Sequence, residues 1–175
     1  MNHILERYEI IKEIGSGATA RVYLAEDRII LRKVAIKQGN HKELLLKEAI
    51  FQANHSSAFF PMLYDYAEGE RSVCLIMELV EGENLKERFQ RIGRYTQEEV
   101  LKIACMIAQA IDSIHTKEPS YVYGDIKPEN IMIQPDGRVR IIDFGTVAKI
   151  EEDKSLTLGE IRGGTRFYAP PEKWQ

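Results

Sequence analysis

Short runs in which apolar and polar residues alternate dominate the first half of the chain. This period of two is typical of β-strands, and turn residues separate the runs. The runs span residues 8–14, 20–26, 30–38, 62–68 and 72–79. Between the third and fourth runs, residues 42–53 place apolar side chains three or four positions apart, which predicts a helix. We therefore expect a β-rich N-terminal portion with one main helix.

The second half of the chain has a helical pattern followed by two short apolar runs. Thr96 and Glu99 are spaced as a capping box, in which each side chain binds the backbone of the other residue at the start of a helix. One apolar stripe follows and predicts a long helix that ends near His115. The stripe comprises Val100, Ile103, Ala104, Ile107, Ile111 and Ile114. Residues 131–133 and 139–142 then predict two strands joined by a Pro-Asp-Gly turn.

The composition is that of a soluble folded chain and excludes several classes of protein. Of the 175 residues, 44% are hydrophobic and 29% are charged, which fits one domain or two compact lobes. The formal charge is −3 and the cations are scattered, so nucleic-acid binding through a basic stripe is disfavoured. No apolar run is long enough to form a membrane segment, and the N-terminus does not resemble a signal peptide. We therefore expect a cytoplasmic chain.

The two cysteines, Cys74 and Cys105, have neither a metal-binding spacing nor the pattern of a disulfide framework. A zinc site is therefore disfavoured, and a reducing compartment fits. Cys74 lies in a predicted strand and Cys105 in the long predicted helix. We expect both to be buried as small hydrophobic residues.

A glycine-containing turn, residues 15–22, lies between the first two predicted strands and reads Gly-Ser-Gly-Ala-Thr-Ala-Arg-Val. Its glycines would let the backbone fold over phosphate groups, although a plain hairpin turn explains the pattern equally well. Lys37 ends the apolar strand Val-Ala-Ile-Lys. Its side chain could contact a phosphate, or it could reach solvent from the edge of a sheet. When Lys37 is considered without the other motifs, the second interpretation is favoured. Glu48, taken alone, is interpreted as an exposed helical glutamate.

A polar loop directly before the strand at residues 131–133 carries three side chains suited to phosphoryl transfer. Asp125 could accept the proton of an attacking hydroxyl, Lys127 could meet the charge of a transferred phosphate, and Asn130 could hold a metal ion. Asp143 is followed by Phe and Gly at the end of the next predicted strand and suits a hard cation such as Mg²⁺. A purely structural loop is the alternative.

The order and spacing of these motifs resemble those of the eukaryotic-like (Hanks-type) serine/threonine protein kinase family. The correspondence runs from about Tyr8 to the last residues and includes Ala169-Pro170-Pro171-Glu172 in the place of Ala-Pro-Glu. The resemblance implies an α+β, two-lobed protein-kinase-like fold. Residues 1–78 would form a β-rich N-lobe, residues 79–83 a hinge, and residues 84–175 a partial helical C-lobe.

The resemblance also implies a site for ATP with Mg²⁺ or Mn²⁺, and a protein substrate with a Ser or Thr acceptor. Lys37, paired with Glu48, would contact the α- and β-phosphates, and Asp125 would be the catalytic base. Lys127 would contact the γ-phosphate. The metal ligands would be Asn130 and Asp143. The nucleotide would also be contacted by Gly15, Ser16, Gly17, Ala18, Val22, Ala35, Met77, Glu78, Val80 and Met132. The segment that contains Thr165 resembles the one that positions the acceptor residue.

Three features depart from the family pattern. Ala20 replaces the third glycine of the turn, which does not count against nucleotide binding. Tyr-Gly-Asp replaces His-Arg-Asp, and Gly124 cannot pair with a phosphorylated activation loop, so we expect activity to be independent of Ser155 and Thr157. The chain ends at Gln175, where family members continue through further helices. An apolar face of the C-lobe is therefore expected to be uncovered and to favour self-association.

Two other functions stay open. Gly124-Asp125 resembles the His-Gly-Asp loop of small-molecule kinases, such as antibiotic and choline kinases, whereas Lys127 and the run at residues 163–170 resemble protein kinases. The chain could also be a catalytically silent nucleotide-binding or interaction module, because its C-lobe would be incomplete.

Overall fold

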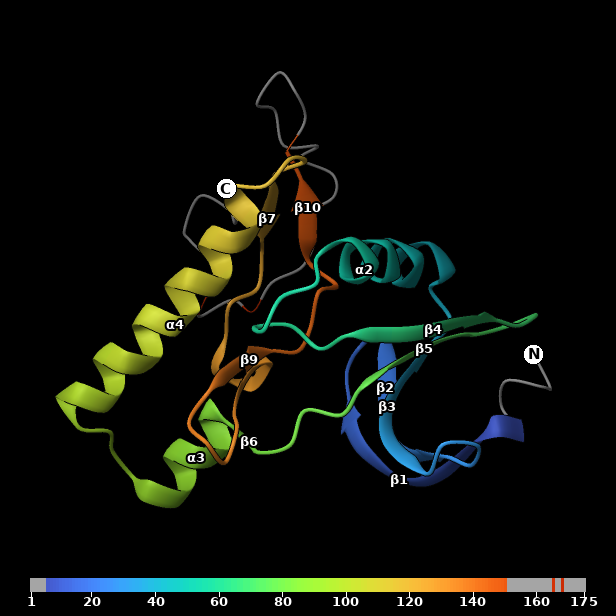
Figure 1. Ribbon diagram of the computed structural model, residues 1–175, viewed down its shortest axis with the longest axis horizontal. Helices are drawn as coiled ribbons and strands as arrows, with labels where there is room; N and C mark the ends of the chain where they lie inside the picture. The colour runs from blue at the N-terminus through green and yellow to red at the C-terminus, as the bar shows by residue number, and fades with distance from the viewer. Residues whose placement is uncertain (1–5, 151–164, 166–167, 169–175) are drawn as a thin grey trace. The chain divides into compact units, whose positions relative to one another are not determined.

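The computed structural model describes residues 6–150, 165 and 168 (Figure 1). The chain divides into two compact units, Met1–Val80 and Glu81–Gln175. The fold is α+β: the first unit is built on an antiparallel sheet, and the second combines helices with short strands. Within the described ranges, no helix is long and apolar enough to cross a membrane.

The first unit is built on a five-stranded antiparallel sheet with the strand order β1-β2-β3-β5-β4. Its strands are β1 (Tyr8–Ser16), β2 (Ala20–Asp27), β3 (Arg32–Gly39), β4 (Leu63–Glu68) and β5 (Val73–Glu78). Helix α2 (Lys42–Asn54) connects β3 to β4 and packs against β4 and β5. The five alternating runs and the helical run of the sequence are therefore confirmed as elements.

Side chains on the two faces of this sheet form two hydrophobic clusters. On β3, Val34 and Ile36 belong to one cluster and Ala35 to the other, because successive residues of a strand point to opposite faces. Leu45 and Ala49 of α2 join the cluster of Ala35. The helix therefore covers the face of the sheet on which the odd-numbered residues of β3 lie.

The turn between β2 and β3 is longer than the sequence pattern indicates. The period of two predicts a strand through Ile30 and Leu31, but both residues lie in the turn and β3 begins at Arg32. The buried carboxylate of Asp27 accepts the backbone N–H groups of Ile29 and Ile30 at 3.0 and 3.4 Å. These side-chain hydrogen bonds end β2 before the aliphatic residues that would otherwise favour a strand.

Among its described residues, the second unit contains the helices α3 (Leu85–Ile92) and α4 (Gln97–His115). Its short strands form a three-stranded sheet in the order β6-β8-β9, and the pair β10-β7. The strands are β6 (Glu83–Asn84), β7 (Tyr121–Tyr123), β8 (Ile131–Ile133), β9 (Val139–Ile141) and β10 (Val147–Lys149), and the 3-10 helix η1 (Pro128–Asn130) precedes β8. The sequence pattern predicted α4, β8 and β9. Strands β6, β7 and β10 are too short to produce a recognisable period.

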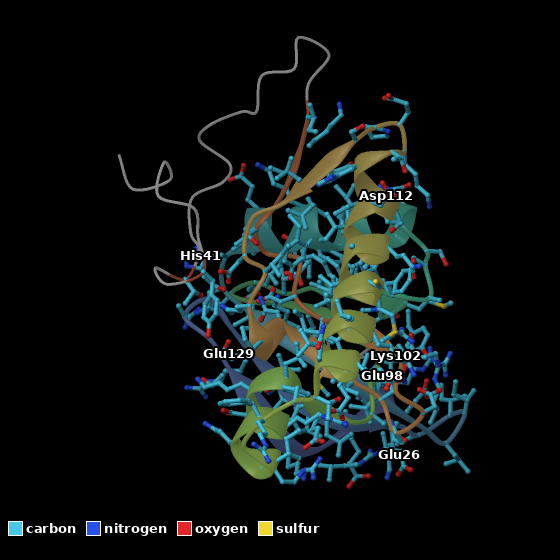
Figure 2. The ribbon with its side chains drawn as sticks, turned by 90° about the vertical axis from the view of Figure 1, so that its left-hand side faces the viewer. Glu26, His41, Glu98, Lys102, Asp112 and Glu129 are labelled. Carbon is cyan, nitrogen blue, oxygen red and sulfur yellow. The ribbon has the colours of Figure 1, made fainter. Side chains whose placement is uncertain are left out.

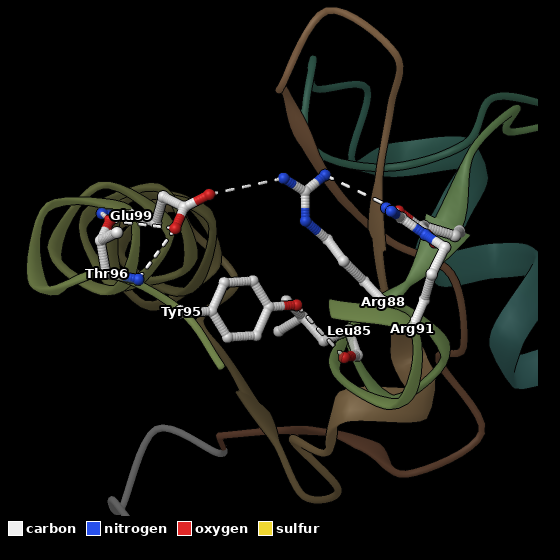
Figure 3. A network of polar contacts seen from close by, with 7 residues as sticks. Leu85, Arg88, Arg91, Tyr95, Thr96 and Glu99 are labelled. Atoms are coloured by element: carbon white, nitrogen blue, oxygen red, sulfur yellow. Dashed lines mark hydrogen bonds and ion pairs between the residues drawn. The ribbon is translucent and has the colours of Figure 1, made fainter. Parts of the chain in front are cut away.

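Both helices of the second unit begin with capping boxes. The predicted box of α4 is confirmed: Thr96 Oγ1 accepts from the N–H of Glu99 at 3.2 Å, and Glu99 accepts from the N–H of Thr96 at 2.8 Å. Asn84 and Glu87 form the same arrangement at the start of α3. The guanidinium group of Arg88 on α3 reaches across to the carboxylate of Glu99 at 3.7 Å (Figure 3). This network holds α3 beside the first turn of α4.

The apolar stripe of α4 is buried only toward the end of the helix, within the described part of the chain. Ala110 and Ile114 are buried, whereas Val100 is 50% exposed. Cys105 on the same helix is exposed, so the prediction that both cysteines are buried is correct for Cys74 and wrong for Cys105. Helical periodicity identifies the apolar side of a helix but not which turns other elements cover. Self-association through such a face stays a prediction.

Candidate active site

In the first unit, the candidate catalytic residues are a lysine on β3 and a glutamate on α2. Lys37 Nζ lies 2.7 Å from both Oε1 and Oε2 of Glu48. Lys37 is 9% exposed and Glu48 is 2% exposed, so the exposed glutamate suggested by its helical position alone is not observed. Two charges removed from water are tolerated when they are paired and hydrogen-bonded, and removing one partner of such a pair costs about 3–5 kcal/mol. The pair therefore holds α2 against the sheet.

The glycine-containing turn is a hairpin between β1 and β2. Gly15 and Ser16 end β1, and Ala18 lies in the turn. The N–H of Gly17 donates to the carbonyl oxygen of Ala20 at 2.9 Å. Neither glycine has a positive φ, and a Cβ added to Gly17 would approach no neighbouring atom closer than 3.6 Å. The packing of the chain itself therefore does not require these glycines, whereas the close approach of another molecule to the backbone would.

The residues expected around an adenine ring lie mainly on neighbouring strands of the same sheet. Ala35 on β3 stands opposite Met77 on β5, and both are buried. Val22 on β2 packs against the cluster that contains them. The N–H of Glu78 donates to the carbonyl oxygen of the residue before β4 at 2.8 Å, so it is already used within the sheet. Val80 is the last residue of the first unit.

In the second unit, Asp125 is the centre of a hydrogen-bonded cluster. Lys127 Nζ donates to Asp125 Oδ2 at 2.6 Å and to Thr165 Oγ1 at 3.1 Å. The backbone N–H of Thr165 donates to Asp125 Oδ1 at 2.8 Å. Asp125 is 8% exposed, so its carboxylate is held by these partners rather than by water. The ammonium group of Lys127 thus lies within hydrogen-bonding distance of both a carboxylate and a hydroxyl, an arrangement that suits proton removal and charge neutralisation.

The two expected metal ligands lie on backbone segments that hydrogen-bond to each other. The carbonyl oxygen of Asn130 accepts from the N–H of Ile142, the residue directly before Asp143, at 3.0 Å. Asn130 Nδ2 donates to the carbonyl oxygen of Asp125 at 3.1 Å, which leaves the amide oxygen as the ligand atom. Asp143 Oδ1 accepts from the N–H of Gly145 at 3.1 Å. One amide oxygen and one carboxylate fit Mg²⁺, which binds few protein oxygens and completes its shell with phosphate and water.

The described residues contain no cluster of three or more His, Cys, Asp and Glu side chains that could hold a metal ion. A metal cage built only from such side chains is therefore absent from the described ranges. Met132, expected beside the nucleotide, lies half-buried on β8 opposite Arg140.

The tyrosine that precedes Gly124 connects the loop that carries Asp125 to the Asp143 segment. The hydroxyl group of Tyr123 donates a hydrogen bond to the carbonyl oxygen of Asp143. Its ring meets the ring of Phe144 edge-on, with the centroids 6.2 Å apart. The N–H of Gly124 also donates to the carbonyl oxygen of Thr146 at 3.2 Å. Together with the pairing of β7 and β10, these contacts hold the two segments side by side.

An ion pair joins α3 to η1, which directly follows Lys127 in the chain. Lys86 Nζ lies 2.8 Å from Oε1 of Glu129, which is labelled in Figure 2. The hydrogen bond from Lys86 lowers the pKa of Glu129 below its usual value, and the same bond raises the pKa of Lys86. The pair thereby neutralises the carboxylate that lies two residues from Lys127 in the chain.

Comparison with known proteins decides the family. A family model described as the protein kinase domain matches residues 8–174. The chain belongs to this family. The protein kinase domain therefore accounts for nearly the whole chain, including both units.

Curated relatives of this protein kinase domain come from bacteria and from the mouse. Serine/threonine-protein kinase PrkC of Bacillus subtilis is 33% identical over 174 residues, which cover 95% of this chain and 26% of that protein. A probable serine/threonine-protein kinase of Clostridium acetobutylicum is 33% identical over 177 residues, which cover 97% of this chain and 26% of that protein. Sperm motility kinase 1 of Mus musculus is 32% identical over 172 residues, 95% of this chain and 34% of that protein. The chain spans about a quarter to a third of the length of these relatives.

The use of Thr165 in this protein kinase domain could not be worked out from local sequence patterns. Its hydrogen bonds to Lys127 and Asp125 join residues 38 and 40 positions apart. The sequence indicated this region only through a family resemblance: the segment around Thr165 resembles the kinase segment that positions the acceptor residue. Ser155, Thr157 and the motif at residues 169–172 lie outside the described residues.

Proposed function

We propose that the chain transfers the γ-phosphate of Mg·ATP to Ser or Thr hydroxyls of proteins. The cluster of Asp125, Lys127 and Thr165 carries this proposal. The hydroxyl of Thr165 accepts from Lys127 at 3.1 Å, so the polar surroundings of Asp125 are compatible with an alcohol group. An acceptor hydroxyl at this position would meet a carboxylate that can take its proton and a cation that can neutralise phosphate charge.

In the proposed reaction, the acceptor oxygen bonds to the γ-phosphorus while the bond from that phosphorus to the bridging oxygen breaks, and ADP leaves. Asp125 accepts the hydroxyl proton, and Lys127 neutralises charge on the transferred oxygens. Mg²⁺ held by Asn130 and Asp143 would neutralise further phosphate charge. The side chains orient and neutralise the reactants, so no covalent enzyme intermediate is needed.

The first unit is proposed to hold the rest of the nucleotide. Lys37, oriented by Glu48, would contact the α- and β-phosphates, because its ammonium group is already desolvated and fixed at 2.7 Å from the carboxylate. The backbone of residues 15–18 would cover the phosphates. The adenine ring would lie among Val22, Ala35, Met77 and Met132, with backbone contacts from Glu78 and Val80. The N–H of Glu78 is used within the sheet, so its contact to adenine would use the carbonyl oxygen.

The same proposal assigns the lobes of the domain. Residues 1–78 would be the N-lobe, residues 79–83 the hinge and residues 84–175 a partial C-lobe. The division of the chain into compact units between Val80 and Glu81 supports a hinge in this region.

Binding of a fluorescent ATP analogue with Mg²⁺ tests the nucleotide half of this proposal. We expect Lys37→Met to abolish binding. Lys33→Met is the matched control, because Lys33 lies on the same strand and is exposed, and it should leave binding unchanged. Equal binding by wild type and Lys37→Met would contradict the proposed phosphate contact.

The acceptor half is tested by offering labelled ATP with a Ser/Thr-rich protein and, separately, with choline or an aminoglycoside. We expect the label to be transferred to the Ser/Thr-rich protein and to the kinase chain itself, and not to choline or the aminoglycoside. Label on the small alcohols alone would favour a small-molecule kinase instead. Nucleotide binding without any transfer would favour a silent nucleotide-binding module.

A further inference from the structure

The turn between β2 and β3 displays three consecutive aliphatic side chains to solvent. Ile29, Ile30 and Leu31 are 71%, 53% and 78% exposed. Single exposed aliphatic residues are normal on protein surfaces, whereas three consecutive ones concentrate apolar surface at one turn. Concentrated exposed apolar surface is typical of protein or membrane interaction sites. The proposed phosphoryl transfer uses none of them. We refer to residues 29–31 as the aliphatic turn.

The backbone of the aliphatic turn is firmly held. The carboxylate of Asp27 is fully buried and accepts from Arg7 Nε and Nη2 at 3.0 and 2.6 Å. It also accepts the N–H groups of Ile29 and Ile30. Leu31 has a φ of 52°, a left-handed conformation that is uncommon for residues other than glycine, Asn and Asp. The chain therefore fixes a strained turn whose aliphatic side chains contribute little to its own core, and such strain is a mark of functional sites.

Cations lie on both sides of the aliphatic turn: Arg28 precedes it, and Arg32 and Lys33 follow it. Neither Arg32 nor Lys33 forms an ion pair with a carboxylate of the described chain, and the guanidinium group of Arg32 lies 3.6 Å from the ring centroid of Tyr64. Arg28 pairs with Glu9 at 3.2 Å, but both side chains are more than half exposed, so this pair is weak. Glu26 and Asp27 on β2 stand opposite Lys33 and Arg32, so residues 26–33 carry three cations and two carboxylates. The turn thus has a local excess of one positive charge, although the whole chain has a formal charge of −3.

We propose that the aliphatic turn is an anchor for bilayer surfaces that contain anionic phospholipid. The side chains of residues 29–31 enter the boundary between headgroups and acyl chains, and Arg28, Arg32 and Lys33 meet the lipid phosphates. Along a strand, these cations lie about 3–7 Å behind the aliphatic residues. That offset matches the depth of about 5–10 Å to which interfacial apolar groups are buried.

A bilayer is favoured over a protein partner by the position of the turn and by its charges. The aliphatic turn joins β2 to β3 at one end of the five-stranded sheet (Figure 1). Its three exposed side chains would need a matching cavity in a protein partner but none in a lipid surface. Cations on both flanks suit a plane of phosphates. Because the chain as a whole is acidic, attraction to an anionic surface must come from this local charge.

Co-sedimentation of the full 175-residue chain with vesicles tests the proposal without requiring phosphoryl transfer. The vesicles are phosphatidylcholine with or without phosphatidylglycerol. We expect binding to the anionic vesicles that weakens with salt, and little binding to the neutral ones. Ile30→Ser with Leu31→Asn should weaken binding at least ~10-fold, because the main apolar contact is lost. Asn tolerates the left-handed conformation, so this variant should fold.

The matched control is Val100→Ser with Leu101→Ser, which removes two aliphatic residues of α4 that are 50% and 58% exposed. It should leave vesicle binding unchanged. A second variant, Arg32→Gln with Lys33→Gln, should weaken binding and reduce its salt dependence. Absence of vesicle binding by the wild type, or equal loss in the turn and α4 variants, would overturn the proposal. So would self-association that depends on residues 29–31 without any vesicle binding.

Discussion

The hydroxyl group of Tyr123 donates a hydrogen bond to the backbone carbonyl oxygen of Asp143. Tyr123 lies two residues before Asp125, the proposed catalytic base, and Asp143 is a proposed magnesium ligand. The contact is available because a tyrosine occupies the place of the histidine in the family motif. It means that this chain holds the Asp143 segment with a phenol group rather than an imidazole.

Tyr123→Phe should raise the Mg²⁺ concentration needed for half-maximal phosphoryl transfer. The substitution keeps the edge-on contact with Phe144 and removes only the hydrogen bond, which is worth about 1 kcal/mol, or a factor of about five in an equilibrium. A magnesium titration of activity measures the shift. Tyr123→His retains a donor and should recover part of the effect. An unchanged magnesium dependence in Tyr123→Phe would show that the bond does not position Asp143.

Gln52→Leu should stabilise the first unit. Gln52 is 4% exposed, and its Nε2 and Oε1 have no hydrogen-bond partner in the described chain. It lies one helical turn after Glu48 on α2, where a buried, unpaired amide costs about 1–3 kcal/mol. We therefore expect the free energy of unfolding in urea to rise by about 1–2 kcal/mol.

Gln109→Leu is the control for this substitution, because Gln109 is exposed on α4. It should change the unfolding free energy by less than about 0.5 kcal/mol. Destabilisation by Gln52→Leu would mean that the amide contributes hydrogen bonds that the leucine cannot replace.

The stability of the chain should depend on Asp27 at acidic pH. The hydrogen bond from Arg7 is the main cause that lowers the pKa of Asp27 from 3.8 to about 2, and the N–H groups of Ile29 and Ile30 lower it further, against the effect of burial. A carboxyl group whose folded-state pKa is depressed stabilises the fold above its unfolded pKa, and this contribution is lost as the pH falls toward the folded value. The loss should therefore occur between about pH 4 and pH 2.

Thermal unfolding of wild type and Asp27→Asn across this range measures the effect. Other carboxyl groups, such as those of Glu68 and Glu83, also have lowered pKa values, so the difference between the two proteins is the relevant quantity. We expect the difference in midpoint to be largest above pH 4 and to shrink as the pH falls. A difference that does not change with pH would contradict the role of the ionised carboxylate.

Phosphoryl transfer should not depend on phosphorylation of Ser155 or Thr157. Gly124 stands where the family motif has an arginine, and it has no side chain with which to bind a phosphate group. The double variant Ser155→Ala/Thr157→Ala should therefore turn over at the rate of the wild type. A large loss of turnover would mean that a cationic side chain elsewhere in the chain binds the phosphate group on Ser155 or Thr157.

The motifs and the strands of the sheet could be predicted because each is encoded by a short stretch of neighbouring residues. The alternation around Lys37 indicates a strand and the period around Glu48 indicates a helix, so their pairing follows once both are placed in one family pattern. The capping box of Thr96 and Glu99 is similarly a property of four consecutive residues. Local patterns therefore identified the elements that carry the candidate site.

Contacts between distant segments could not be predicted in this way. Thr165 reaches Asp125 across 40 positions, and no short motif encodes that hydrogen bond. The exposure of Cys105 depends on which other elements cover each turn of α4. Helical periodicity carries no information about those elements. The strand expected through Ile30 fails because the side chain of Asp27 competes for its backbone N–H.

Transfer of labelled γ-phosphate by wild type and Asp125→Asn is the most direct test of the proposed kinase function. Asparagine retains an oxygen that can accept from the N–H of Thr165, which lies 2.8 Å from Asp125 Oδ1, but it cannot take the acceptor proton. We predict transfer to a Ser/Thr-rich protein by the wild type, and a loss of about 10²–10⁴-fold in Asp125→Asn with nucleotide binding unchanged. Equal transfer rates in the two proteins, or none in the wild type, would contradict the account.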